Sequence, residues 1–382
     1  MTIHLIIALL WMGVMIALYW LIRDRYRSLG KLKARSRHPE PTPSVTVIIP
    51  ARDEEANIEA CLKGLLTQDY PRGSLDILAV DDNSSDDTPA IVERLAASEP
   101  RLDLLQAPPL PPGWRGKQNA CWHGAQHAQG DWLCFTDADT RAESALIATA
   151  IAETQKHQLD LLSLHPHQVM KSFWERLLMP VPFLTLMMLL DARRINDPSD
   201  RAAMANGQFI LLHRAVYNEV DGHRSVRAAV LEDVEIAKRV KRAGFRIAIR
   251  GGGDLIRTRM YRDLSTLWNA LARNGSELFG PTLTALAVLN AFFAAVFPWG
   301  YPLWLAVRLG SENTWIAVAA LSAAAIGSAA WYAMHAMALR IHNVPLTYLL
   351  LLPITDFLMG VVNLDGLVQR LRGRRTWKGR PI

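Results

Sequence analysis

Two carboxylates separated by a single residue give the first sign of chemistry in this sequence of 382 residues. Asp137 and Asp139 follow residues 132–136, an apolar and aromatic run that is typical of a buried strand. In an open α/β sheet, ligands bind beyond the carboxyl ends of the strands, where this pair would emerge. Two carboxylates alone bind a diphosphate badly, whereas a hard cation such as Mg²⁺ or Mn²⁺ takes carboxylate and phosphate oxygens together. The pair therefore predicts a metal-assisted phosphate site, and a chance acidic surface turn is the alternative.

Acidic residues also follow the two strands that are predicted before this one. Asp53 and Glu55 come after the strand that ends at Pro50, and Asp81 and Asp82 end the next strand. Predicted strands and helices alternate here as in a parallel, doubly wound sheet, so these acids should converge on one cleft. Neither a Gly-x-Gly-x-x-Gly nor a Walker Gly-Lys-Ser/Thr motif follows these strands, which disfavours dinucleotide and P-loop sites.

A second acidic pair begins a predicted helix further along the chain. Glu232 and Asp233 lie in the first turn of residues 231–240, where the helix dipole favours carboxylates. They are interpreted either as N-terminal capping alone or as a general base. The strand predicted before this helix is entered through Gly207 and Gln208, and the glycine would let the backbone approach a ligand closely.

These motifs resemble the nucleotide-sugar half of the family 2 glycosyltransferases, in the order and spacing of that family. The resemblance rests on residues 47–50, 54–55, 80–88, 116–117 and 137–139. It implies an α/β GT-A fold, Rossmann-like, with a mostly parallel doubly wound sheet. It also implies that Asp53 or Glu55, together with Asp82, contacts the uridine, that Asp137 lies near the ribose, and that Asp139 holds the metal. The donor-binding set is Pro50, Asp53, Glu55, Asp81, Asp82, Lys117, Asp137, Gly207 and Gln208, and the metal ligands are Asp139 and Asp137.

In this family an acidic pair supplies the catalytic base, and its second member matches Asp233, with Glu232 beside it. Asp233 would take the proton of an acceptor hydroxyl as that hydroxyl attacks the anomeric carbon. The metal at Asp139 would offset the charge of the departing nucleoside diphosphate. No covalent intermediate is needed, so a single displacement would invert the anomeric centre.

Residues after the predicted base resemble a narrower membrane subgroup, which includes the hopene-associated and carotenoid glycosyltransferases of bacteria. The resemblance rests on residues 259–261, Trp268, residues 273–274 and residues 377–380. In that subgroup lysine precedes the asparagine, whereas this chain has Arg273, and the two side chains are not interchangeable. Arg259 and Arg273 are candidates to bind the diphosphate, with anchoring at the membrane surface as the alternative. The Gln-x-x-Arg-Trp motif of many polysaccharide synthases is missing here, which disfavours a processive polymerase.

Apolar segments at both ends of the chain predict a membrane protein. Residues 3–22 have the length of one bilayer crossing, and the basic residues 23–37 that follow place the amino terminus outside and the next domain in the cytoplasm. Residues 281–308, 315–338 and 345–362 are also membrane-like. Three further crossings would put the basic tail outside, so we expect either a re-entrant 345–362 or a hairpin at 281–308, and a cytoplasmic tail.

The expected organisation has five parts. They are an anchor at 1–22, a basic juxtamembrane linker at 23–44, a GT-A domain at 45–275, transmembrane segments at 276–365 and a basic tail at 366–382. Residues 177–190 are apolar but short for a span, so they are interpreted as an interfacial segment that admits a lipid, or as a buried core helix.

The sequence thus predicts an inverting hexosyltransferase of the inner membrane, with a UDP-sugar donor and a membrane lipid acceptor of isoprenoid, hopanoid, carotenoid or glycerolipid type. Nucleic acid is disfavoured as a partner, because the basic residues behind the net charge of +6 flank apolar spans. The alternatives are a polyprenyl-phosphate glycosyltransferase or polysaccharide synthase, and a non-catalytic membrane scaffold. Which sugar and which lipid are used is not encoded in any short motif.

Overall fold

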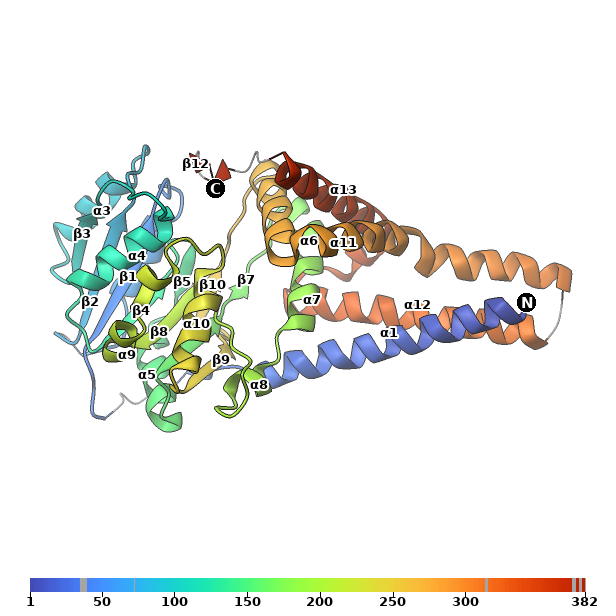
Figure 1. Cartoon of the computed structure of the whole chain (residues 1–382), viewed down its shortest axis with the longest axis horizontal. Coiled ribbons are helices and arrows are strands. Elements are labelled where there is room, and N and C mark those ends of the chain that lie inside the picture. The colour runs from blue at the N-terminus through green and yellow to red at the C-terminus, as the bar shows by residue number, and fades with distance from the viewer. Residues whose placement is uncertain (35–39, 72, 313–314, 373–375, 378–379, 382) are drawn as a thin grey trace. The chain divides into compact units, whose positions relative to one another are not determined.

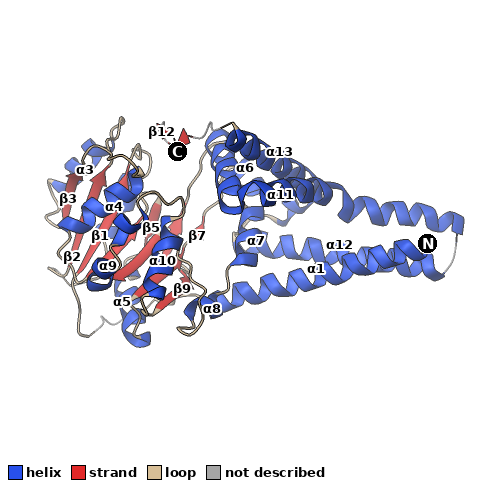
Figure 2. Cartoon of the chain, viewed as in Figure 1, coloured by secondary structure: helices blue, strands red, loops and turns tan. Residues whose placement is uncertain are grey.

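The computed structural model describes residues 1–34, 40–71, 73–312, 315–372, 376–377 and 380–381 (Figure 1). It divides into two compact units. The α/β unit comprises Ser28–Val169 and Asp191–Met260, and the helical unit comprises Met1–Arg27, Met170–Leu190 and Tyr261–Ile382. Figure 2 shows the strands concentrated in the α/β unit and the long helices in the helical unit.

A seven-stranded sheet forms the centre of the α/β unit, with the strand order β3-β2-β1-β4-β8-β6-β9. The strands β3, β2, β1 and β4 are parallel to one another, β8 runs antiparallel to β4 and β6, and β9 is parallel to β6. The predicted mostly parallel sheet is therefore confirmed. The strands are β1 (Val45–Ala51), β2 (Leu75–Asp81), β3 (Leu102–Gln106), β4 (Trp132–Thr136), β6 (Leu161–His165), β8 (Phe209–His213) and β9 (Ile247–Gly251).

The central strands β1 and β4 are mostly apolar, as expected for strands that are covered on both faces. Every residue of β4 is buried, and so is every residue of β1 except Pro50. A smaller three-stranded sheet has the order β5-β10-β7. Its strands are β5 (Thr140–Ala142), β10 (Ile256–Thr258) and β7 (His167–Gln168).

Helices connect these strands. One close approach positions the site: a Cβ on Gly124 would lie 2.7 Å from Ile48 Cγ2 and 2.9 Å from Val80 Cγ2. Glycine therefore lets α4 lie directly on β1 and β2. The helices are α2 (Ile58–Leu66), α3 (Thr88–Ala96), α4 (Gly116–His127), α5 (Leu146–His157), α8 (Ala192–Asn196), α9 (Arg214–Glu219), the 3₁₀ helix η1 (Gly222–Val226) and α10 (Glu232–Arg242).

In the helical unit, four helical stretches are long and apolar enough to cross a membrane: Thr2–Leu29, Gly280–Arg308, Trp315–Ile341 and Leu346–Leu371. The first extends beyond the predicted residue 22. The elements are α1 (Thr2–Leu29), α6 (Phe173–Leu178), α7 (Pro180–Leu189), α11 (Leu264–Glu312), α12 (Trp315–Ile341), the 3₁₀ helix η2 (Leu346–Leu351), α13 (Leu352–Leu371), β11 (Thr376–Trp377) and β12 (Arg380–Pro381).

The hairpin alternative for residues 281–308 is wrong. The helix runs through Pro298 and Pro302, and its backbone leaves the helical region only at Gly280, with φ 69° and ψ 175°. Pro281 disfavours the helical conformation for the residue before it, and glycine readily takes a positive φ, so the kink falls there. The apolar segment 177–190 forms the end of α6 and the whole of α7 within the helical unit.

Candidate active site

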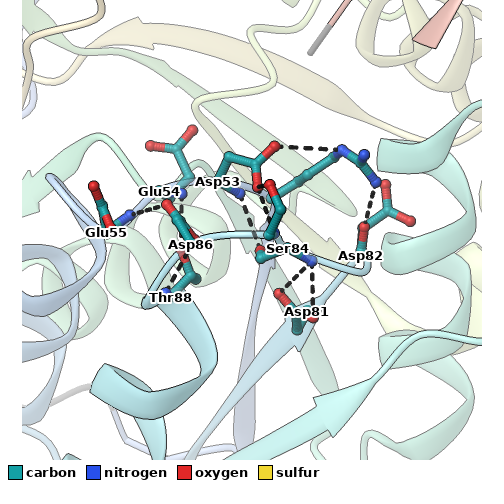
Figure 3. Close-up of polar contacts among 10 residues, drawn as sticks. Asp53, Glu54, Glu55, Asp81, Asp82, Ser84, Asp86 and Thr88 are labelled. Atoms are coloured by element: carbon teal, nitrogen blue, oxygen red, sulfur yellow. Dashed lines mark hydrogen bonds and ion pairs between the residues drawn. The ribbon is translucent and has the colours of Figure 1, made fainter. Parts of the chain in front are cut away.

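The loops after β1 and β2 are tied to each other by their acidic side chains (Figure 3). Asp53 Oδ1 accepts hydrogen bonds from the backbone N–H of Ser85 at 2.7 Å and from its hydroxyl at 3.0 Å. Glu55 donates its backbone N–H to Asp86 Oδ2 at 3.0 Å, and Glu55 Oε2 accepts the N–H of Asp87 at 3.3 Å. Both carboxylates thus hold the neighbouring loop, and their contact with a uridine stays a prediction.

Asp81 and Asp82 also lie at this edge of the sheet. The Asp81 carboxylate accepts the backbone N–H of Ser84 at 3.2–3.3 Å and Gln106 Nε2 at 3.0 Å. Asp82 is buried, and its backbone carbonyl accepts Arg52 Nη1 at 2.8 Å. The structure therefore gives Asp81 a role in shaping the loop, next to the donor-binding role that the sequence predicts.

The Asp139 carboxylate has an environment that suits a metal ligand. Its Oδ1 is shielded from solvent and has no hydrogen-bond partner within the described part of the chain. Burial, followed by the nearby carboxylates of Asp137 and Glu54, raises the pKa of Asp139 to about 7. A divalent cation would bind the unpaired oxygen and offset the repulsion between the carboxylates. The residues present therefore fit a divalent cation. Among the described residues no group of three or more His, Cys, Asp or Glu side chains could hold a metal, so such a cation would need ligands from phosphate and water.

Lys117, at the start of α4, links the carboxyl end of β4 to the start of α10. Its Nζ lies 2.8 Å from Asp137 Oδ1 and 3.0 Å from Glu232 Oε1. Burial alone would lower the pKa of this ammonium, but Asp137 and Glu232 raise it well above the usual range. Lys117 is therefore charged at any physiological pH and neutralises two carboxylates across the site.

Asp233 is held in one orientation by two backbone groups. Its Oδ2 accepts the N–H of Gly207 at 2.8 Å, and its Oδ1 accepts the N–H of Val234 at 2.8 Å. A Cβ on Gly207 would lie 3.0 Å from Lys117 Nζ and 3.4 Å from Asp233 Oδ2, so glycine keeps this corner open. Burial and then the Glu232 carboxylate raise the pKa of Asp233 to about 7, the range that suits a general base.

These groups line one pocket, whose empty volume is about 240 Å³. The pocket brings together six of the predicted residues, from five separate segments: Pro50, Lys117, Asp137, Gly207, Glu232 and Asp233. It is also lined by residues that the sequence analysis did not select: Cys121, Phe135, Thr136, Ile210 and His223. His223 is the polar addition of most interest. A lone histidine after a glycine carries no motif, so only its position in the fold could select it.

Other predicted residues are not among those that line this pocket. Gln208 is buried, and its Oε1 accepts Gln168 Nε2 at 3.1 Å. The backbone N–H of Arg259 is 3.5 Å from the carbonyl oxygen of Asp139. Arg273 belongs to α11 of the helical unit, where its Nε donates to Asn274 Oδ1 at 3.2 Å. The roles of Gln208, Arg259 and Arg273 at a donor stay predictions.

Part of the chain is similar to a known protein family. The family model described as glycosyl transferase family 2 matches residues 46–221. Two 4,4'-diaponeurosporenoate glycosyltransferases, from Staphylococcus aureus strains USA300 and MRSA252, are 26% and 27% identical over 260 and 263 residues. Each alignment covers 65% of this chain and 66% of the relative, just under two thirds of its length.

A solved structure shows the same fold. The mannosyltransferase PcManGT from Pyrobaculum calidifontis, in complex with GDP-Man and Mn²⁺, is 22% identical and superposes with a TM-score of 0.57. The match covers 96% of this chain and 99% of that one. The α/β unit therefore has the GT-A fold, and its residues 46–221 match the model of glycosyltransferase family 2.

Proposed function

We propose that this protein is an inverting hexosyltransferase that moves a sugar from a nucleotide-sugar donor, with UDP as the expected nucleotide, to a membrane lipid. One observation carries the proposal. Asp233 is an oriented carboxylate with a pKa of about 7. It shares a pocket with Asp137, one of the acids at the strand ends, and with Lys117 of helix α4. A base and a diphosphate-binding edge in one pocket are what a single displacement at an anomeric carbon requires.

Asp233 acts as the base. The N–H groups of Gly207 and Val234 each occupy one of its oxygens, which fixes the carboxylate plane relative to the pocket. A pKa near 7 leaves a substantial ionised fraction at neutral pH while keeping the carboxylate basic enough to take a proton from a hydroxyl. The alternative interpretation, capping of α10 alone, accounts for the bond to Val234 but not for the bond to Gly207.

Asp139 and Asp137 would hold Mg²⁺ or Mn²⁺, which when bound offsets the negative charge of the leaving diphosphate. Lys117 presents a second positive charge in the same pocket, and its two ion pairs hold it there before a donor arrives. Glu232 anchors one of these pairs, so its role is to position Lys117. Its charge also helps to raise the pKa of Asp233.

The lipid acceptor is supported by two observations. The helical unit contains four stretches that are apolar and long enough to cross a membrane. The relatives from Staphylococcus aureus are named for diaponeurosporenoate, a carotenoid. The basic residues among positions 23–37, at the end of α1 and just after it, support a cytoplasmic face of the inner membrane as the place of the α/β unit.

The test uses the full-length protein in detergent with a bacterial lipid extract and Mn²⁺ or Mg²⁺. Labelled UDP-glucose, UDP-N-acetylglucosamine and GDP-mannose are offered in turn, and label that enters the organic phase is counted and identified by mass spectrometry. We expect transfer from one donor, abolished by EDTA. Donor binding without transfer to any lipid would support a scaffold, and label in a water-soluble polymer would support a polysaccharide synthase. Either result would refute the proposal.

A further inference from the structure

His223 is a pocket residue to which the proposed chemistry assigns no role. It lies in the first turn of η1 and is 3% exposed, yet it lines the pocket. Its ring packs against Phe135 with 4.7 Å between the ring centroids. A buried histidine in a binding pocket is either a packing residue or a hydrogen-bonding one, and its nitrogen partners decide between these.

The tautomer of His223 follows from the hydrogen bonds of Tyr217. The Tyr217 hydroxyl oxygen accepts the backbone N–H of His223 at 3.2 Å and lies 3.0 Å from His223 Nδ1. Tyr217 is fully buried, and Nδ1 is the only acceptor for its hydroxyl proton within the described part of the chain. Buried hydroxyl protons are almost always donated, so Tyr217 donates to Nδ1 and the ring proton sits on Nε2.

The backbone holds the ring in this orientation. Gly222 has φ +35°, and a Cβ there would lie 2.1 Å from Tyr217 Cζ, so the tyrosine ring lies directly against the glycine. Tyr217 also stacks on Phe135, with ring centroids 5.5 Å apart. His223 is thus fixed by its own backbone N–H, by Nδ1 and by its contact with Phe135.

The imidazole is neutral at physiological pH. Burial, and then the nearby Lys117 ammonium, lowers the pKa of His223 to about 3. Nε2–H is therefore a neutral donor, and within the described residues the hydrogen bonds of His223 are those of its Nδ1 and its backbone N–H.

The other polar groups of the pocket make this donor distinctive. Asp137, Glu232 and Asp233 are acceptors, and the one ammonium, Lys117, is already paired with two of them. A sugar hydroxyl donates one hydrogen bond and accepts others, so it needs a donor as well as a carboxylate. We propose that His223 is a specificity-determining residue, whose Nε2–H donates a hydrogen bond to one hydroxyl of the transferred hexose. This inference rests on the proposed function.

The experiment compares the wild type with His223→Phe, which keeps an aromatic ring without the donor, and with His223→Gln, which keeps an N–H. The probes are the 2-, 3-, 4- and 6-deoxy analogues of whichever panel donor supports transfer. For the wild type we expect one analogue to lose about tenfold in kcat/KM, because a site built for a hydroxyl rejects the analogue that lacks it. In His223→Phe the loss at that position should disappear while the losses at other positions remain, and His223→Gln should restore part of it.

Two controls keep the test decisive. Binding of UDP and GDP by His223→Phe shows that the variant is folded, and His213→Phe, on β8 outside the pocket, should discriminate as the wild type does. If the wild type transfers sugar and His223→Phe keeps the same discrimination at every position, the role of His223 is refuted and the proposed function stands. If the wild type transfers sugar from no donor, the proposed function is wrong and this inference falls with it.

Discussion

Replacing Asp233 with asparagine tests the proposed base, because the substitution keeps the shape of the side chain and removes its negative charge. The single amide oxygen takes the place of only one of the two carboxylate oxygens that accept the N–H groups of Gly207 and Val234. One of these N–H groups therefore loses its carboxylate partner. Loss of a general base typically costs a factor of about 10²–10⁴ in rate, or roughly 3–5 kcal/mol in the barrier. We therefore expect kcat for transfer to fall by about this factor while donor binding changes little.

The pH dependence of the transfer rate gives a second, independent test of the base. With a pKa of about 7, Asp233 is mostly protonated at pH 6, so wild-type transfer should fall roughly tenfold for each pH unit below the pKa. In Asp233→Asn the residual rate should lose this acid limb. Glu235→Gln is the matched control, because Glu235 lies in the same helix turn but pairs with Lys238 at 2.7 Å outside the pocket. It should behave as the wild type.

Thermal unfolding in detergent checks the same pKa without turnover. Because folding raises the pKa of Asp233 from 3.8, the folded protein binds its proton more tightly than the unfolded chain does. The resulting stability is fully present below pH 3.8 and is lost as the pH rises through about 7. Relative to the wild type, Asp233→Asn should therefore gain in Tm between pH 5 and pH 8. If the variant keeps more than a tenth of the wild-type kcat, or keeps the acid limb, Asp233 is not the base.

Four further substitutions test the metal, the ion pairs and the packing. Asp139→Asn should raise the Mn²⁺ concentration for half-maximal transfer on the order of tenfold, since it removes a charged ligand; an unchanged Mn²⁺ titration would contradict the metal role. Lys117→Met leaves two carboxylates without their cation, and because these groups are partly exposed we expect a loss of about 1–3 kcal/mol in unfolding free energy. Unchanged denaturation would show that the ion pairs contribute nothing. Gly222→Ala forces a Cβ into the Tyr217 ring and should cost about 2–4 kcal/mol. Gly244→Ala, which has φ +92° and meets no atom within 4 Å, should lose only about 1 kcal/mol from backbone strain. Equal effects of the two glycine variants would argue against the packing account.

The sequence by itself determined the elements and the edge at which the site lies. Strands such as Val45–Ala51 and Trp132–Thr136 are short apolar runs, and α10 has helical periodicity with acids in its first turn. These patterns depend on residues two to four positions apart, so they can be recognised without knowledge of the fold. Because the strands are parallel, the acids after them had to gather at one edge.

Only the tertiary structure decided what each acid does there. Asp53 sits at a strand end like Asp137, yet it binds the neighbouring loop while Asp137 pairs with Lys117 in the pocket. The bond between Gly207 and Asp233 and the position of His223 likewise join segments that are distant in sequence. Such pairings depend on how whole elements pack, and no local period encodes them. Helix α11 likewise continues through Pro298, although proline is a local helix breaker. The surrounding chain keeps this segment helical, and the local sequence alone does not show that.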